Sequence, residues 1–269
     1  MAKGRPFFEL LTSALRGDYR FLILELFAFL FALATFVFGA VLVAPGGASA
    51  EVTAYSFASS LMGLPSFVFV ILILKNIAYG LGSDIEKGVI QTLLSYPIKR
   101  RSILTAKLLS GIGLALLVYL SLQIYAMYLV AQEIVGPYLT TVLVTYAANL
   151  SFIFLLAGVV LTVTLLLKKG GTALIVGVVL FFASGIAGGL VTVISDGVDS
   201  PLPLQAYSVI TPSLALQNYY SALSSPSVAE SALWVPTFPE VLAYVLSGWV
   251  VVILVFAVAY VYFDRRFGV

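Results

Sequence analysis

Long apolar runs separated by short polar stretches dominate the chain, and six of these runs are long enough to cross a membrane. A transmembrane helix needs roughly 20 residues to span a hydrocarbon layer of about 30 Å. The six runs cover residues 21–44, 55–81, 103–130, 138–167, 172–194 and 241–263. A helix satisfies its backbone hydrogen bonds internally, as the bilayer interior demands. The pattern therefore predicts an all-α membrane protein whose six-helix transmembrane domain covers residues 21–269.

The first 20 residues have an amphipathic pattern instead. Phe7, Leu10, Leu11, Ala14 and Leu15 recur at helical spacing among basic residues. This spacing is typical of a helix that lies in the membrane interface. A signal peptide explains the segment less well, because the apolar run that follows is too long and no small-residue cleavage site precedes polar sequence.

Residues 80–107 form the one sizeable charged interruption between two long apolar runs. Gly80 and Gly82 can end the preceding helix. Ser83 and Glu86 have the spacing of a capping box, in which each side chain accepts a hydrogen bond from the other residue's backbone N–H. We therefore expect a new helix to begin there.

Apolar residues at helical spacing continue this new helix, and Pro97 ends it. These apolar residues are Ile85, Val89, Ile90, Leu93 and Leu94. Ser102 is a suitable N-cap for the next long helix. Two interpretations of the amphipathic helix remain open from the residues alone: it rests on lipid head groups, or it docks a partner that transmits force to the spans.

The placement of charge predicts the orientation in the membrane. All fourteen Lys and Arg residues lie in or beside the N-terminal segment, the stretch from 75 to 107, the 168–169 turn or the 265–266 end. The other three connections carry only acidic charges. Because basic loops face the cytoplasm, we expect a protein of the cell membrane with both termini cytoplasmic.

The connection from residue 195 to 239 is the longest of the acidic ones and contains six prolines. A structureless loop of this length is uncommon. The run Ser213–Leu223 follows Pro212 and predicts a short helix started by Ser213, lying against the outer membrane face.

Composition excludes several classes of function. The chain is 61% apolar and contains neither Cys nor His, the residues that supply most ligands of haem, copper, zinc and iron–sulfur sites. The phosphate-binding pattern GxxxxGK[ST] is absent, as are HExxH and GxSxG. We therefore expect no catalytic residue, metal or cofactor in this chain, and no nucleic-acid partner.

Few polar groups lie within the apolar runs. Glu25 favours an interfacial or capping role, and Gln123 and Asn149 favour hydrogen bonds between helices. A transporter coupled to protons or sodium ions normally needs more ionisable groups than these. The scarcity of charge mildly favours an apolar or amphipathic cargo.

The fifth run has small residues four positions apart, Ser184 with Gly188 and Gly185 with Gly189. Small residues at this spacing let helix backbones approach closely. This face predicts tight packing, either within the chain or across a dimer axis.

The central stretch also resembles a known family. Its Glu86, Gly88, Leu93, Leu94, Ser95, Pro97, Arg100, Leu104 and Lys107 resemble the E..GT.E.LLS.P..R..IL..K pattern of the type-2 ABC exporter permeases. The six-run layout with an amphipathic N-terminal helix adds to the resemblance. Two positions depart from the pattern, Val89 in place of Thr and Gln91 in place of Glu.

The resemblance implies a permease subunit that works as a dimer, with a second copy or a homologous permease, beside two copies of an ATPase subunit that binds ATP and Mg. It implies an elbow helix over residues 7–16 and outer helices within 195–239. The segment that couples to the ATPase would be residues 84–101. Its coupling residues would be Asp84, Glu86, Lys87, Gly88, Gln91, Leu93, Leu94, Pro97 and Arg100.

Two other classes of function remain open from the sequence. One is a secondary transporter or channel that works without ATP, and the other is a noncatalytic membrane anchor. The first would move solute down an ion gradient as the isolated chain, whereas the second would bind an ATPase without moving solute.

Overall fold

The computed structural model describes residues 5–20, 22–40, 49–265 and 267, and this part is helical without a β-strand. Five helices are long and apolar enough to cross a membrane: Ala50–Glu86, Arg100–Leu129, Gln132–Leu167, Gly170–Val198 and Phe238–Arg265. They fit a multi-pass all-α membrane protein and match five of the six predicted spans.

Several of these long helices are built from more than one segment. The bounds are α3 Ala50–Leu74, η1 Lys75–Leu81, α4 Gly82–Glu86, α6 Arg100–Leu108, η2 Leu109–Gly113, α7 Leu114–Val135, α8 Leu139–Leu167, α9 Gly170–Val198 and α13 Phe238–Arg265. A 3-10 turn, η3 (Gly136–Tyr138), joins α7 to α8. Both η1 and η2 are π-helical. Such segments are rare in proteins as a whole, but where they occur they often lie at functional sites.

The predicted first span is described only in part. Helix α1 (Arg5–Asp18) and helix α2 (Ile23–Ala40) meet at 68°, and they pass as a sixth candidate span only when counted as one bent pair. Residues 41–48, in which the predicted span ends, lie outside the described residues. The sixth span therefore stays a prediction.

Helices α3 and α8 form the centre of the bundle. Helix α3 packs against α2, α7 and α8, and α8 packs against α13 and α9. Burial falls steeply from the centre outward. Of the apolar 18-residue stretch in each candidate span, 56% is buried in the spans that contain α3 and α8, but only 6% in α9. Helix α9 is therefore the least covered of the five candidate spans.

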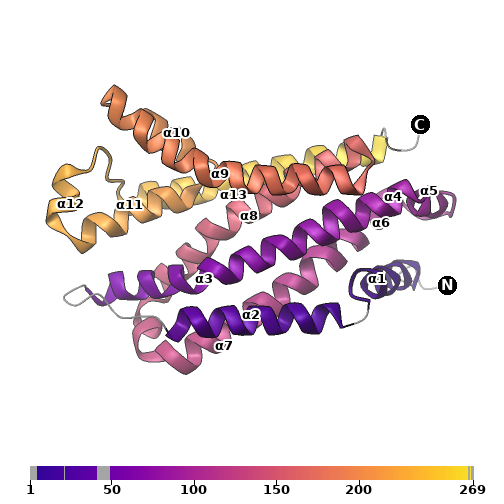
Figure 1. Cartoon of the computed structure of the whole chain (residues 1–269), viewed down its shortest axis with the longest axis horizontal. Helices are drawn as coiled ribbons and strands as arrows, with labels where there is room; N and C mark the ends of the chain where they lie inside the picture. Colours follow the sequence, from indigo (N-terminus) through magenta and orange to yellow (C-terminus); the bar gives the residue numbers. More distant parts are fainter. Residues whose placement is uncertain (1–4, 21, 41–48, 266, 268–269) are drawn as a thin grey trace.

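The two ends of the bundle differ in charge and structure. At one end, the basic end, lie α1, α4, α5 (Val89–Leu94), α6 and the C-terminal end of α13 (Figure 1). At the other lie α10 (Leu202–Ser208), α11 (Pro212–Ser224) and α12 (Pro226–Ser231). Helix α11 confirms the predicted helix after Pro212, although the residue before it, Thr211, takes the N-cap position without a side-chain hydrogen bond.

Helix α11 is fixed to the bundle by Tyr220. Its hydroxyl lies 3.0 Å from Glu51 Oε1 and 3.1 Å from Thr141 Oγ1. Its ring stacks on Tyr55, with the ring centroids 4.2 Å apart. Burial raises the pKa of the Tyr220 hydroxyl, which therefore stays protonated and can donate to the carboxylate. The connection from 195 to 239 is thus a packed layer.

The opposite location of Lys99 and Val228 gives a direct test of orientation. The chain contains no cysteine, so single-cysteine variants report one site each. Both residues are exposed. We expect Lys99→Cys to react with a membrane-impermeant maleimide only after cells are opened, and Val228→Cys to react in intact cells, because basic loops face the cytoplasm. The reverse labelling pattern would overturn the predicted orientation.

Candidate functional site

The predicted coupling segment, residues 84–101, turns sharply at Gly88. Helix α4 ends at Glu86, and α5 begins after Gly88, whose φ of 74° lies in the left-handed region that favours glycine. The prediction that Gly80 and Gly82 end the preceding helix is wrong, because η1 and α4 continue through them with helical backbone angles. The helix break therefore falls six residues after Gly82.

The predicted capping box is also wrong. No side chain caps α4, and Ser83 lies inside the helix. Glu86 Oε1 instead accepts a hydrogen bond of 2.9 Å from the backbone N–H of Gly170. Gly170 is the first residue of α9, where the backbone N–H groups lack partners within the helix and favour negative charge. Glu86 therefore joins α4 to the start of α9.

Two glycines let these helices touch at that point. A Cβ added to Gly82 would lie 2.4 Å from the Cα of Gly170, and one added to Gly170 would lie 2.9 Å from the N of Ser83. Every near neighbour in this contact is backbone. Gly82 thus allows α4 and α9 to cross closely and does not end a helix. Its presence in the sequence fits both roles, so the prediction of a helix end was wrong.

The far side of the segment is bonded to α6 and α13. Asp84 forms an ion pair of 2.5 Å with Lys107. Arg100 Nη1 donates to the backbone carbonyl of Phe267 at 2.9 Å, and Arg101 pairs with Asp264 Oδ2 at 2.7 Å. Arg100 and Arg101 thus bind a backbone carbonyl and a carboxylate at the C-terminal end of α13. Positive charge is favoured at this end of a helix. The N-cap of α6 is Lys99, so the expected cap role of Ser102 is wrong.

The remaining side chains of the segment divide into an exposed and a packed set. Val89 and Tyr96 are 41% and 56% exposed, and Lys87, Gln91 and Pro97 are exposed as well. We call these five residues the docking surface, after the partner-docking role that the sequence leaves open for this segment. Ile90 is fully buried, and Leu93 and Leu94 pack against the core. The left-handed turn at Gly88 changes the helical register, so Val89 does not share the buried face predicted for it.

A buried polar cluster lies behind the segment, where α1 meets both π-helical segments. Ser110 Oγ donates to Asp18 Oδ2, and Lys75 Nζ donates to the Asp18 backbone carbonyl. Asn76 Nδ2 donates to Tyr19 Oη at 3.1 Å and to the Gly111 carbonyl at 2.9 Å. The cluster therefore binds α1 to η1 and η2.

Burial raises the pKa of the Asp18 carboxyl, although the positive charge of Lys107 and the Ser110 hydrogen bond oppose this shift. Asp18 was not predicted from the sequence, where Glu25 stood out instead. Lys75, a cation inside an apolar run, was the available signal that a buried partner lay nearby.

The small-residue face of α9 has little contact within the chain. No atom of the residues that the structure describes lies within 4 Å of a Cβ added to Gly185 or Gly189. At one edge, Tyr207 of α10 donates to the Ser184 carbonyl at 2.9 Å, and its ring lies 3.8 Å from a Cβ added to Gly188. Gly185 and Gly189 therefore take no part in tight helix packing within the described part of the chain.

The two neutral polar residues of the third and fourth spans behave differently. Gln123 Nε2 donates to Thr35 Oγ1 at 3.1 Å, and Tyr146 donates to Gln123 Oε1 at 2.7 Å. These bonds join α7 to α2 and α8, as predicted. Asn149 donates to Thr145 O at 2.8 Å within its own helix, so the expected bond between helices is not formed there.

The described residues contain no group of three or more His, Cys, Asp or Glu side chains that could hold a metal ion. No protein-family model matches the chain. A search of curated proteins also finds no significant match.

The glycine contact predicts an asymmetric response to alanine. Gly82→Ala drives a methyl group into the α9 backbone and should destabilise the protein by about 1–3 kcal/mol, as overpacking typically does. Gly171→Ala is the matched control, because no atom in the described part of the chain lies within 4 Å of its added Cβ. Thermal unfolding in detergent checks both variants. Equal melting temperatures for the two variants would contradict the close crossing.

The buried Asp18 predicts a pH effect. Because its pKa is raised from the ordinary 3.8, its stabilising contribution is complete below that pH and is lost as pH rises through the raised value. The Asp18→Asn variant has no proton to lose at this position. Its melting temperature, relative to that of the natural protein, should therefore increase as pH rises. If the melting temperatures of the two proteins differ by the same amount at every pH from below 3.8 upward, Asp18 ionises in the folded state as easily as in the unfolded state, which would contradict the prediction.

Proposed function

We propose that the chain is the transmembrane permease subunit of an ATP-driven exporter of the type-2 ABC class, and that a separate ATPase subunit binds the docking surface. The observation that carries this proposal is the set of bonds that leave residues 84–101. Through Glu86, Asp84, Arg100 and Arg101, this short segment is attached to α9, α6 and α13. A displacement of the segment would therefore reach several spans at once.

The covalent connections support the same proposal. Helix α4 continues directly into η1 and α3, and α6 continues into η2 and α7. The segment is thus the tip of two long helices, and ATP-driven closure of two docked subunits would tilt both of them. Such rigid-body movement is an established way to expose a central path alternately to the two membrane faces.

A separate subunit has to supply the energy in this proposal. The chain lacks the GxxxxGK[ST] loop, so ATP and Mg would bind to the partner. The described residues also offer few ionisable groups within the spans for coupling to an ion gradient. Helix α1 would be the elbow helix at the cytoplasmic surface of the cell membrane, with both termini cytoplasmic.

We further propose that a second permease copy, or a homologous permease, packs on α9. This helix is the least buried candidate span, and among the described residues no atom lies within 4 Å of a Cβ added to Gly185 or Gly189. Small residues that face lipid are well suited to close contact with another helix. The dimer would align two docking surfaces for the two ATPase subunits.

Removing the bonds that join residues 84–101 to the spans tests whether ATPase binding can be separated from the transmission of movement to the spans. In vesicles that contain the chain and its ATPase, we expect Glu86→Ala combined with Arg100→Ala to keep ATPase binding but to lower transport per ATP hydrolysed by about tenfold or more, because each removed bond is charge-assisted. Val228→Ala, at the opposite end, is the control and should transport normally.

Two results would contradict the proposal. One is unchanged transport per ATP in the double variant with membrane insertion intact. The other is solute movement by the isolated chain along an ion gradient, which would favour a secondary transporter or channel. Binding of an ATPase without any solute movement would instead indicate a membrane anchor.

A further inference from the structure

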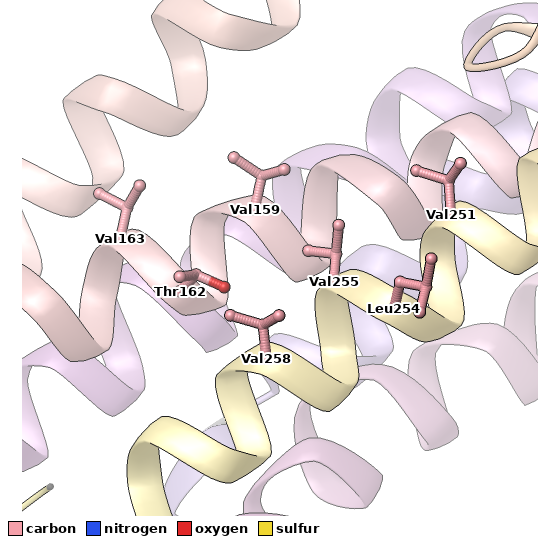
Figure 2. A pocket seen from close by; sticks show the side chains of 7 residues that line it. All are labelled: Val159, Thr162, Val163, Val251, Leu254, Val255 and Val258. Carbon is pink, nitrogen blue, oxygen red and sulfur yellow. The ribbon is translucent and has the colours of Figure 1, made fainter.

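A narrow apolar groove runs between α8 and α13. Its volume is about 330 Å³, and its lining residues are Val159, Thr162, Val163, Val251, Leu254, Val255 and Val258 (Figure 2). The hydroxyl of Thr162 donates to the Gly158 carbonyl at 2.9 Å within α8. The one polar side chain in the lining is therefore already satisfied. The groove offers an occupant apolar contact and no free hydrogen-bonding group.

The groove is bounded toward the outer helices. Gly248 lies one turn before Val251 on α13, and a Cβ added to it would lie 2.7 Å from Cγ of Pro212. The start of α11 thus covers α13 just beyond the groove. The base of the groove is closed where Val255 and Phe256 contact Gly158, with separations of 3.0 and 3.2 Å from an added Cβ. Along α13, the direction left for an occupant to extend is toward the basic end.

Three cations lie in that direction. Arg265 follows Val258 by seven residues, so it lies on nearly the same face of α13, about 10 Å farther along the helix. Lys168 and Lys169 form the turn between α8 and α9, and all three basic residues are exposed. The Lys168 ammonium lies 5.2 Å from the ring centroid of Phe267, at the end of α13. Positive charge therefore lies about 10 Å beyond Val258, on the basic-end side of the apolar groove.

We propose that the groove binds one hydrocarbon chain of an anionic phospholipid, whose head group lies beside Arg265, Lys168 and Lys169. Basic pockets between transmembrane helices are suited to acidic lipid head groups, and the separation along α13 matches a molecule with a polar head and an apolar tail. This inference does not depend on the proposed transport function.

A hydrocarbon chain fits the groove better than a helix from a second copy. The lining consists mainly of β-branched side chains and contains no glycine, so a second backbone cannot approach closely. The open face with Gly185 and Gly189 is on α9. The chain thus has a separate and better surface for a second helix.

Native mass spectrometry of the purified chain tests the proposal without any ATPase. The probes are dioleoyl phosphatidylglycerol and dioleoyl phosphatidylcholine, each titrated separately, with glycerol phosphate as a competitor. We expect the anionic lipid to bind more tightly, and glycerol phosphate not to displace it. We expect Val258→Trp to lower retention of the anionic lipid at least tenfold by filling the groove. Ile253→Trp is the control, because Ile253 is exposed on α13 but does not line the groove.

Charge removal tests the head-group end. Replacing Lys168, Lys169 and Arg265 together by Gln should weaken phosphatidylglycerol binding by about fivefold per cation removed and leave phosphatidylcholine unchanged. Lys99→Gln, an exposed cation elsewhere at the basic end, should have no such effect. Thermal unfolding verifies that each variant is folded.

Three outcomes would overturn the proposal: equal binding of both lipids, full lipid retention by folded Val258→Trp, or conversion of a dimer to monomers by Val258→Trp. The last outcome would assign the groove to a second copy of the chain. None of these results bears on whether an ATPase couples through residues 84–101.

Discussion

The contact between α4 and the first residue of α9 determines how the basic end of this protein is built. Two glycines, Gly82 and Gly170, bring the helix backbones together, and the Glu86 carboxylate accepts a hydrogen bond from the N–H exposed at the start of α9. In a bilayer, helices do not gain from hiding apolar surface from water, so close packing and hydrogen bonds hold them together. This contact combines both, which makes α4 a fixed extension of the bundle.

The other bonds of the basic end depend on that fixed position. With α4 held against α9 by this contact, Asp84 lies beside Lys107 and the turn at Gly88 directs the docking surface outward. Behind it, the Asp18 cluster attaches α1 to the two π-helical segments. The exposed turn is thus supported from several sides, as our proposal that it transmits force requires. The groove between α8 and α13 lies away from this turn and serves a different ligand in our account.

The sequence predicted those parts of the fold that depend on local pattern. The lengths of the apolar runs predicted five described spans, and Pro212 marked the start of α11. The failures came where tertiary contacts override local rules. Gly82 has the character of a helix terminator, but its function is to admit the α9 backbone. Glu86 has a partner 84 residues away, which no local capping rule can identify. The sequence thus singled out residues 84–101 as a charged segment between two spans, but the individual bonds of these residues were not predictable.

Cross-linking from the docking surface tests the central claim most directly. A photoreactive amino acid at Tyr96, 56% exposed at the basic end, can capture a partner that contacts this surface in the native membrane, and the same probe at Val228 serves as the control. Our account predicts a cross-link from position 96 to a protein with a GxxxxGK[ST] loop that hydrolyses ATP, and none from position 228. Cross-links from position 96 to lipid alone, in membranes that transport solute, would contradict it.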